Sequence, residues 1–244
     1  MSHAVFADVA ESAVLSELFQ NPALGARQVA MAPDTVLFAP QQPADNVYLI
    51  LEGQIRLYQV ACDGSCRLTD ILGPNAWVGA AALAGLRDYP VQAVAATASV
   101  VLQAPAARLL TLLNQHPQAA RVLIRHLVGK LQAAREDAGR LVFDDCNQRL
   151  LKTLLRFSRS AAATTTPEGV ILRITHNQLA QAVGVARETI SLALTELRHQ
   201  NLLRTGRNQL IFNPETLRQL VERRGGGAAP AASPSGPLEH AACA

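Results

Sequence analysis

Short apolar runs separated by turn residues predict strands over the first part of the chain, from residue 29 to about residue 103. Residues 47–51 and 100–102 are two of these runs, and Gly, Pro and Asp residues lie between such runs. Residues 62–66 read Cys-Asp-Gly-Ser-Cys, and Asp-Gly supplies the positive φ that a tight hairpin turn requires. We therefore expect a small barrel or sandwich of short strands, with one hairpin tip at 62–66.

After these strands the spacing of apolar residues becomes helical. Pro105 and Pro117 suit the first turns of two successive helices, since a missing N–H costs nothing there. In the second helix, apolar residues recur at alternating intervals of four and three, which is the heptad pattern of a coiled-coil seam. The seam consists of Ala120, Ile124, Leu127, Leu131, Ala134, Ala138 and Leu141. This pattern favours a parallel homodimer over the alternative, a helix that lies across the strand domain of a monomer.

Residues 175–199 contain two short helical patterns on either side of a glycine. Thr175 and Gln178 form a capping-box pair that starts the first helix. Gly184 ends it, and a second helix starts near Arg187. The expected inward faces are Leu179, Ala180 and Val183 in the first helix and Ile190, Ala193, Leu194 and Leu197 in the second. Two short helices around a glycine turn predict a helix-turn-helix.

The segments around this motif complete a second domain. Residues 148–157 predict a further helix, and residues 161–167, Ala-Ala-Ala-Thr-Thr-Thr-Pro, predict a loop. Residues 203–212 predict a glycine-tipped hairpin, or wing, after the helix-turn-helix. From residue 225 the chain is rich in Gly, Ala, Pro and Ser and carries one charge, the pattern of a disordered tail.

Composition excludes several classes of protein. Hydrophobic residues make up 49% and charged residues 17%, which allows a buried core. The longest apolar run, at residues 80–86, is far shorter than the roughly 18 residues of a membrane helix. Residues 1–20 show no signal-peptide pattern, and four irregularly spaced cysteines form no disulfide framework. We expect a soluble, cytoplasmic protein without a membrane segment.

The net charge of +3 conceals an asymmetry between two parts of the chain. Residues 1–146 hold 10 Lys and Arg against 13 Asp and Glu, a balance of −3, whereas residues 147–227 hold 12 against 5, a balance of +7. A basic segment joined to a mildly acidic one is the pattern expected when one domain meets a polyanion such as nucleic acid. A solvated surface that is merely rich in arginine is the alternative.

The outward side chains of the second helix carry the chemistry of base recognition. Arg187 can fork onto O6 and N7 of guanine, and Glu188 can accept a hydrogen bond from N4 of cytosine. Because phosphates repel a carboxylate, Glu188 on a DNA-facing surface is best explained as a base reader. Arg204 and Arg207 of the wing are placed to meet phosphates, and we assign His176 the same role. An ordinary helical hairpin with exposed charges is the alternative.

At residues 187–191, Arg-Glu-Thr-Ile-Ser, and in the order of its parts, the chain resembles the Crp-Fnr family of transcription regulators. The resemblance implies an α+β fold: an N-terminal cyclic-nucleotide-binding-like β-roll, a long dimerisation helix and a C-terminal winged helix-turn-helix. It implies a homodimer on a palindromic site of double-stranded DNA, with RNA polymerase as a further partner. It also implies base contacts by Arg187, Glu188 and Ser191. Leu192 stands where both main branches usually have arginine, and a leucine there could meet a thymine methyl.

The residues with which this family binds a cyclic nucleotide are missing. Binders have a cassette that opens with Gly-Glu and closes with Arg-Ser or Arg-Thr, but the corresponding pairs here are Gly79-Ala80 and Pro90-Val91. The polar pair that meets the purine in the cAMP-responsive branch falls at Ala134-Arg135. A buried phosphate without a cation or N–H cluster would be very costly, so we expect an effector other than cyclic AMP or GMP. Residues 89–93 resemble the Fnr and nitrogen-oxide-responsive branches more closely.

The sequence also bears on three other ways of sensing a signal: an iron–sulfur cluster, haem and the oxidation of cysteines. An Fnr-type iron–sulfur cluster is not expected, because no cysteine precedes Cys62. Haem stays open as a cofactor: His3, His116, His126 and the cysteines are candidate ligands, but none lies in a decisive motif. Cys62 and Cys66 flank the hairpin tip, could lie opposite one another and could report oxidants through a disulfide. Their spacing predicts no metal site, since tetrahedral zinc would need two more ligands.

We therefore predict a homodimeric, non-enzymatic transcription regulator that binds an inverted-repeat DNA site. The expected parts are a β-roll sensor domain with flanking helices (1–115), a dimerisation helix (116–146), a DNA-binding domain (147–224) and a disordered tail (225–244). One alternative is a haem- or thiol-based redox or gas sensor whose ligand state gates DNA binding. The other is a thiol oxidoreductase, for which the sequence offers no nucleophile–base pair, phosphate loop or metal cluster.

Overall fold

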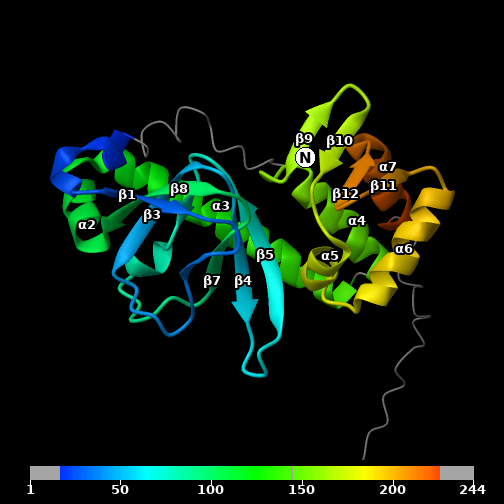
Figure 1. Cartoon of the computed structure of the whole chain (residues 1–244), viewed down its shortest axis with the longest axis horizontal. Helices are drawn as coiled ribbons and strands as arrows, with labels where there is room; N and C mark the ends of the chain where they lie inside the picture. Colours follow the sequence, from blue (N-terminus) through cyan, green and yellow to red (C-terminus); the bar gives the residue numbers. More distant parts are fainter. Residues whose placement is uncertain (1–16, 144, 226–244) are drawn as a thin grey trace, which may run out of the picture.

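The computed structural model describes residues 17–143 and 145–225, which form two lobes (Figure 1). The first lobe is a β-roll, and the second combines helices with a small sheet. A long helix, α3 (Pro117–Phe143), passes behind the strands of the β-roll and leads towards the second lobe. None of the described helices is long and apolar enough to cross a membrane.

Eight strands in two four-stranded sheets make up the β-roll, as the many short apolar runs predict. All strand pairs are antiparallel. In spatial order, one sheet consists of β1 (Arg27–Met31), β8 (Ser99–Pro105), β3 (Asn46–Glu52) and β6 (Trp77–Val78). The other sheet consists of β2 (Val36–Phe38), β7 (Gln92–Ala95), β4 (Ile55–Val60) and β5 (Cys66–Leu72).

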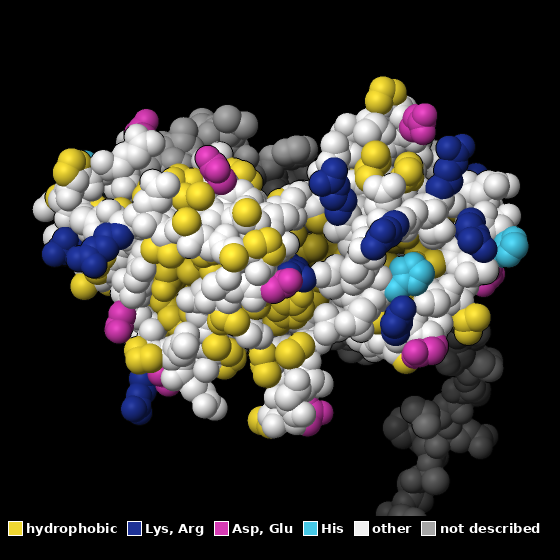
Figure 2. All heavy atoms as spheres, in the orientation of Figure 1, with side chains coloured by type: hydrophobic (Ala, Val, Ile, Leu, Met, Phe, Trp, Pro, Cys, Tyr) yellow, Lys and Arg dark blue, Asp and Glu magenta, His cyan; other side chains and the backbone are white. Residues whose placement is uncertain are grey.

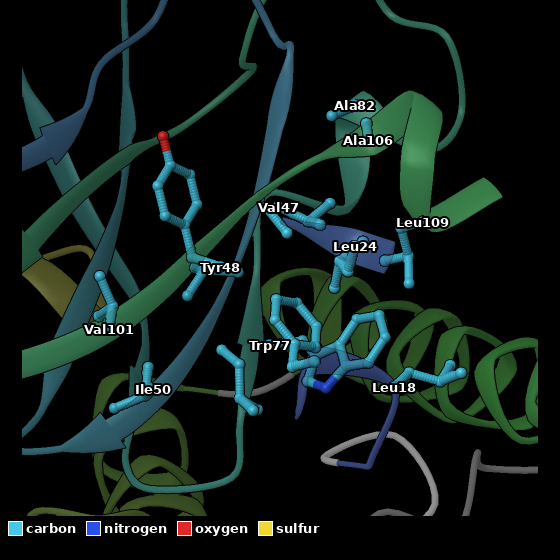
Figure 3. Packing of buried hydrophobic residues seen from close by; sticks show 14 of the residues in the cluster. Leu18, Leu24, Val47, Tyr48, Ile50, Trp77, Ala82, Val101, Ala106 and Leu109 are labelled. Carbon is cyan, nitrogen blue, oxygen red and sulfur yellow. The ribbon is translucent and has the colours of Figure 1, made fainter. Parts of the chain in front are cut away.

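One hydrophobic core fills this lobe. Burial alternates along β7, where Ala93 and Ala95 are buried, because successive side chains of a strand point to opposite faces. Side chains from the strands, from the short 3-10 helices η1 (Pro22–Leu24) and η2 (Ala80–Ala82) and from α2 (Ala106–Gln115) gather in one cluster (Figure 3). The cluster extends to Leu123 of α3, so the long helix is anchored on the β-roll.

The two prolines lie at the helix starts that the sequence predicts. Pro105 is the N-cap of α2, and Pro117 is the first residue of α3. Proline is tolerated at these positions because the first N–H groups of a helix have no partner within it.

The predicted seam of α3 carries an exposed apolar stripe. Ala120 packs partly against the β-roll core. Further along, the exposed apolar side chains are Ile124 (61% exposed), Leu127 (39%), Val128 (47%) and Leu131 (52%). Their spacing of three and four residues places them on one face of the helix. The side chains of Ala134, Ala138 and Leu141 lie outside the described residues.

The second lobe has a helical part and a four-stranded sheet in the order β11-β12-β10-β9. Its helices are α4 (Cys146–Phe157), α5 (His176–Val183), α6 (Arg187–His199) and α7 (Pro214–Gly225). Its strands are β9 (Ala163–Thr166), β10 (Gly169–Leu172), β11 (Leu203–Gly206) and β12 (Gln209–Phe212). The predicted helix at 148–157 is confirmed within α4, whereas the predicted tail lies beyond residue 225, outside the described residues.

The loop predicted at residues 161–167 is wrong, because Ala163–Thr166 forms strand β9. It pairs with β10, with Thr164 opposite Ile171. Thr164 and Thr165 are exposed, since β9 is the edge strand of the sheet. A polar edge strand has the composition of a loop, but threonine is β-branched and stable in an extended backbone once a neighbouring strand pairs with it.

Strand β5 joins the two lobes. Leu68 and Ile71 of this strand are buried in the hydrophobic core of the second lobe rather than in that of the first. Arg156 Nη1 of α4 donates a hydrogen bond to the carbonyl oxygen of Thr69, at 3.1 Å. The DNA-binding lobe expected from the sequence therefore packs directly against a hairpin of the β-roll.

Candidate nucleic-acid interface

Local hydrogen bonds set the limits of the first helix of the predicted helix-turn-helix. The Gln178 N–H donates to Thr175 Oγ1 (3.1 Å), and the Thr175 N–H donates to Gln178 Oε1 (3.0 Å), which completes the predicted capping box. Gly184 ends α5 with a φ of 78° and donates its N–H to the carbonyl of Ala180. This left-handed conformation favours glycine. Both predicted ends of the helix are confirmed.

The second helix, α6, begins at Arg187 as predicted. Ala186 occupies the N-cap position and supplies no side-chain hydrogen bond. Ile190, Ala193, Leu194 and Leu197 are buried, which confirms the expected inward face. Arg187 and Glu188 are exposed at the start of the helix, and Leu192 is 74% exposed. Arg187, Glu188 and Leu192 therefore face solvent, while Ser191 on the same helix is partly buried.

A hydrogen-bonded pair ties the start of α5 to α6. Ser191 Oγ donates to the carbonyl oxygen of Arg187 (3.0 Å), and His176 Nδ1 lies 3.1 Å from Ser191 Oγ. His176 Nδ1 and Ser191 Oγ are therefore within hydrogen-bond distance of each other. Ser191, which the resemblance assigns to base contact, also positions His176.

The predicted wing is present, but its tip differs from the expectation. Gly206 ends β11 and pairs with Gln209, so Arg207 and Asn208 form the two-residue turn. Asn208, with a φ of 55°, has the left-handed conformation in this turn, whereas Gly206, the glycine expected at the tip, is the last residue of β11. Asparagine tolerates this conformation better than other non-glycine residues. The predicted phosphate contact Arg207 therefore lies at the wing tip.

Arg204, the other predicted phosphate contact, lies on β11. Its side chain is 82% exposed, and its Nη1 is 3.9 Å from Glu168 Oε2. An exposed ion pair at this distance contributes little, so the guanidinium can exchange Glu168 for a phosphate.

An open groove of about 470 Å³ lies between the first turns of α5 and α6 and the wing. Its lining includes His176, Asn177, Arg187, Asn208 and Gln209. The groove thus brings together two of the predicted residues, His176 and Arg187, beside Asn208 and Gln209 of the wing; the predicted wing residues Arg204 and Arg207 are not part of its lining. Sequence reading missed Asn177, whose outward position in the first turn of α5 was the available signal. Figure 2 shows Lys and Arg side chains gathered around a histidine on this face of the second lobe.

A second hollow, of about 200 Å³, lies in the β-roll where α3 passes the sheets. Its wall consists of residues 77–81 and 89–91 together with Phe38, Leu57, Leu123 and Leu127. None of these lining residues is charged at neutral pH. Both segments at which the family's nucleotide cassette opens and closes lie in this apolar wall.

An aromatic cluster forms part of the same wall. The rings of Phe38 and Tyr89 stack with their centroids 4.0 Å apart. Tyr89 Oη donates to the carbonyl oxygen of Asn46 (2.6 Å) and accepts from the Asn46 N–H (3.2 Å). Burial raises the pKa of the neighbouring Tyr48, and its interaction with Tyr89 raises it further. The phenols are therefore neutral hydrogen-bonding groups rather than anions.

The expectation that Cys62 and Cys66 lie opposite one another is wrong. The register of β4 and β5 pairs Val60 with Cys66, and Cys62 lies in the turn that follows. Both are free thiols, with Cys62 exposed and Cys66 partly buried. Gly64 has the positive φ expected for the hairpin tip. Register is a property of the paired strands, and Cys-Asp-Gly-Ser-Cys alone does not determine it.

The candidate haem ligands are not brought to the cavity. His116 is an exposed residue at the end of α2, and the described residues that line the cavity include no histidine or cysteine. His3 and the side chain of His126 lie outside the described residues. Within the part of the chain that the structure describes, no cluster of His, Cys, Asp or Glu could hold a metal ion.

Comparison with known proteins agrees with this geometry. Residues 28–116 match the cyclic nucleotide-binding domain, and residues 148–220 match the Crp-like helix-turn-helix domain. The chain is 30% identical over 198 residues to the transcriptional regulator SdrP of Thermus thermophilus, which covers 80% of this chain and 94% of that protein. It is 29% identical over 188 residues to a CRP-like cAMP-activated global transcriptional regulator of Mycobacterium tuberculosis, covering 74% and 82%.

Among solved structures, the chain is similar to a transcriptional regulator of the CRP/FNR family from Thermus thermophilus. The TM-score is 0.67 at 28% identity, over 80% of this chain and 98% of that one. The match spans both lobes, so the order of β-roll, long helix and helix-turn-helix domain is common to the two proteins.

Proposed function

Because this chain belongs to the Crp-Fnr family of transcription regulators, we propose that it binds an inverted-repeat DNA site as a homodimer. The family is one of DNA-binding regulators rather than enzymes. In this proposal, residues 1–115 form the sensor domain, 116–146 the dimerisation helix and 147–224 the DNA-binding domain. The cytoplasm is the expected compartment, and RNA polymerase the expected further partner.

The apolar stripe on α3 supports the homodimer. Ile124 and Leu131 are more than half exposed in the single chain although both are large and apolar. Contiguous exposed apolar surface marks an interaction site, and the 4–3 spacing matches the seam of a parallel coiled coil. A second copy of the same helix satisfies both conditions.

The groove beside α6 carries the proposed recognition of DNA. Arg187, Glu188 and Ser191 read bases from the first turns of α6, and Leu192 contacts a thymine methyl. His176, Arg204 and Arg207 surround them and contact phosphates. The supporting observation is that His176 of α5, Arg187 of α6 and Asn208 of the wing turn line one open groove, with Arg207 next to Asn208 in that turn.

Selection of binding sites from random duplex DNA tests this function. We expect two enriched inverted half-sites with centres about one helical turn apart. Glu188→Ala should change which sequences are enriched, whereas Arg207→Ala should weaken all sequences alike and reduce the salt dependence. A uniform loss of affinity in both variants would refute the assignment of Glu188 as a base reader. No enrichment from protein prepared with or without oxygen would refute the proposed site.

We infer further that the effector is not a cyclic nucleotide. The cavity of about 200 Å³ has an apolar wall, and Gly79-Ala80 and Pro90-Val91 in that wall offer no cation for a phosphate. The relatives include a cAMP-activated regulator, but desolvating a phosphodiester against this wall would be very costly. Residues 89–93 favour the Fnr and nitrogen-oxide-responsive branches over the cAMP-binding branch.

A thiol switch is the second candidate for sensing, because of where the hairpin tip lies. Cys66 and Arg187 line one cleft of about 610 Å³ between the β4–β5 hairpin and the helix-turn-helix. Oxidation at this tip would add polar bulk beside the start of α6. Hydrogen peroxide should then alter DNA affinity in the natural chain and not in a Cys62→Ser, Cys66→Ser variant. An equal response of both proteins would exclude these thiols.

A further inference from the structure

A cleft of about 390 Å³ lies between the two lobes, next to the DNA-facing groove. The β-roll contributes Gln54, Arg56 and Thr97 to its lining, and the second lobe contributes Arg173 and Arg207, among others. The volume falls within the range of about 300 to 1,000 Å³ that is usual for small-molecule sites. Sequence reading does not single out Arg56 or Arg173, because they are far apart in the chain.

Among the described residues, the charge that lines this cleft is of one sign. Three of these lining residues are arginines and none is a carboxylate. Arg56 is paired with the exposed Asp34 (2.6 Å), its side chain is only 13% exposed, and its Nε is buried without a hydrogen-bond partner. Arg173 and Arg207 are exposed, and neither forms an ion pair among the described residues. Two uncompensated guanidinium groups therefore face one hollow, with a third, buried one in its wall.

The neutral part of the lining is already held in place. Gln54 Nε2 donates to the carbonyl oxygen of Ala161, at 2.6 Å across the two lobes. The Arg173 N–H donates to the carbonyl oxygen of Ala162, which fixes the backbone at Arg173. Gln178 is engaged in the capping box of α5. A site whose walls are fixed before binding loses less entropy when a ligand arrives.

We propose that this cleft binds a small phosphorylated anion, with Arg173 and Arg207 as its main ligands. A guanidinium offers a planar fork of donors that matches phosphate oxygens, and such charge-assisted hydrogen bonds are strong. The anion would lie between Arg173 and Arg207 of the second lobe and the wall of the β-roll that contains Arg56. Arg207 lines the cleft, and the neighbouring Asn208 lines both the cleft and the groove. A bound anion therefore competes with a DNA phosphate for Arg207 and lowers DNA affinity.

Calorimetric titration of the full chain with inorganic pyrophosphate, at constant ionic strength, tests the site. We expect saturable binding of one pyrophosphate per chain. Arg173→Gln should weaken it by about tenfold or more, since it removes a charge-assisted hydrogen bond. Arg159→Gln, which removes an exposed arginine of the same lobe outside the cleft, should bind as the natural chain does. Circular dichroism and the melting temperature check that both variants are folded.

Two results would overturn the proposal. Equal binding by the natural chain and both variants would mean an adventitious ion only, and an absence of binding would mean that no free anion is recognised. If pyrophosphate does not bind but Arg173→Gln weakens every DNA sequence alike, the cleft belongs to the path of the DNA backbone instead.

Competition with DNA is the second part of the test, and it alone rests on the proposed function. Saturating pyrophosphate should raise the Kd of a selected duplex severalfold in the natural chain, and less in Arg173→Gln. Unchanged DNA affinity in the natural chain would refute the coupling through Arg207. If pyrophosphate binds and Arg173→Gln abolishes this binding, while no DNA sequence is ever selected, the cleft stands and the proposed regulator function fails.

Discussion

The groove beside α6 and the cavity beside α3 are both hollows next to a helix, yet their walls have opposite chemistry. The groove is open and polar, with His176, Asn177 and Arg187 in its lining. The described residues that line the cavity are apolar or aromatic, and none of them is charged. The groove therefore offers polar and basic groups that suit a polyanion, whereas the described lining of the cavity offers no cation for a phosphate. Function is a property of such sites rather than of the fold as a whole.

The largest expected effect comes from disrupting the proposed homodimer seam on α3. Ile124→Glu combined with Leu131→Glu places like charges along the seam, so we expect monomers in analytical ultracentrifugation. Affinity for an inverted repeat should fall by about 10²- to 10⁴-fold, because each half-site is then bound separately. Leu110→Glu, at an exposed apolar position of α2 away from the seam, is the matched control. A dimer of unchanged affinity would contradict the assigned seam.

The next effect sharpens the assignment of the DNA-facing groove. Arg187→Lys keeps the charge but loses the fork that matches guanine, so discrimination at one base pair should fall by about 1–3 kcal/mol. Fluorescence anisotropy with a selected duplex and its single-base variants measures this loss, while the salt dependence should stay the same. Arg198→Lys, near the other end of α6, serves as the control. A loss that is equal for all sequences would show that Arg187 contacts only the backbone.

A smaller effect concerns Tyr48, which stacks on Phe38 of the cavity wall. Burial raises the pKa of Tyr48 above its ordinary value of 10.0, so the folded chain retains a proton that the unfolded chain releases. The contribution of Tyr48 to the free energy of unfolding should be fully present below about pH 10 and should decrease as the pH rises above this value. Urea unfolding at a series of alkaline pH values should show a shallower fall for Tyr48→Phe. An identical pH dependence in both proteins would show that Tyr48 does not contribute to it.

The last prediction is that cyclic AMP has no effect. Cyclic AMP should change neither the melting temperature nor the DNA affinity of the Arg173→Gln variant. This variant is used because its interlobe cleft should bind phosphates more weakly, so that any response to cyclic AMP reports on the apolar cavity. A ligand present at 100 times its Kd would stabilise the folded state by about 2.7 kcal/mol, which thermal denaturation detects. A clear rise in melting temperature would show that the apolar cavity accepts a nucleotide after all.

Features that depend on neighbouring residues were predictable from the sequence. Thr175, Gln178 and Gly184 fix both ends of α5 through hydrogen bonds and a backbone conformation within ten residues, so the helix-turn-helix was placed correctly. The strands of the β-roll follow from short apolar runs in the same way. The edge strand β9 was missed because its threonines are exposed and polar, and only the pairing with β10 makes them a strand.

The sequence by itself determined the order of the domains, the recognition helix with its outward residues, and the missing charges of the nucleotide cassette, since each depends on spacing or on residue identity. Only the tertiary structure decided that Val60 rather than Cys62 faces Cys66, because register arises from the pairing of whole strands. It alone placed Leu68 and Ile71 in the core of the second lobe and brought Arg56, Arg173 and Arg207 around one cleft. Such contacts join residues from distant parts of the chain, and no local pattern encodes them.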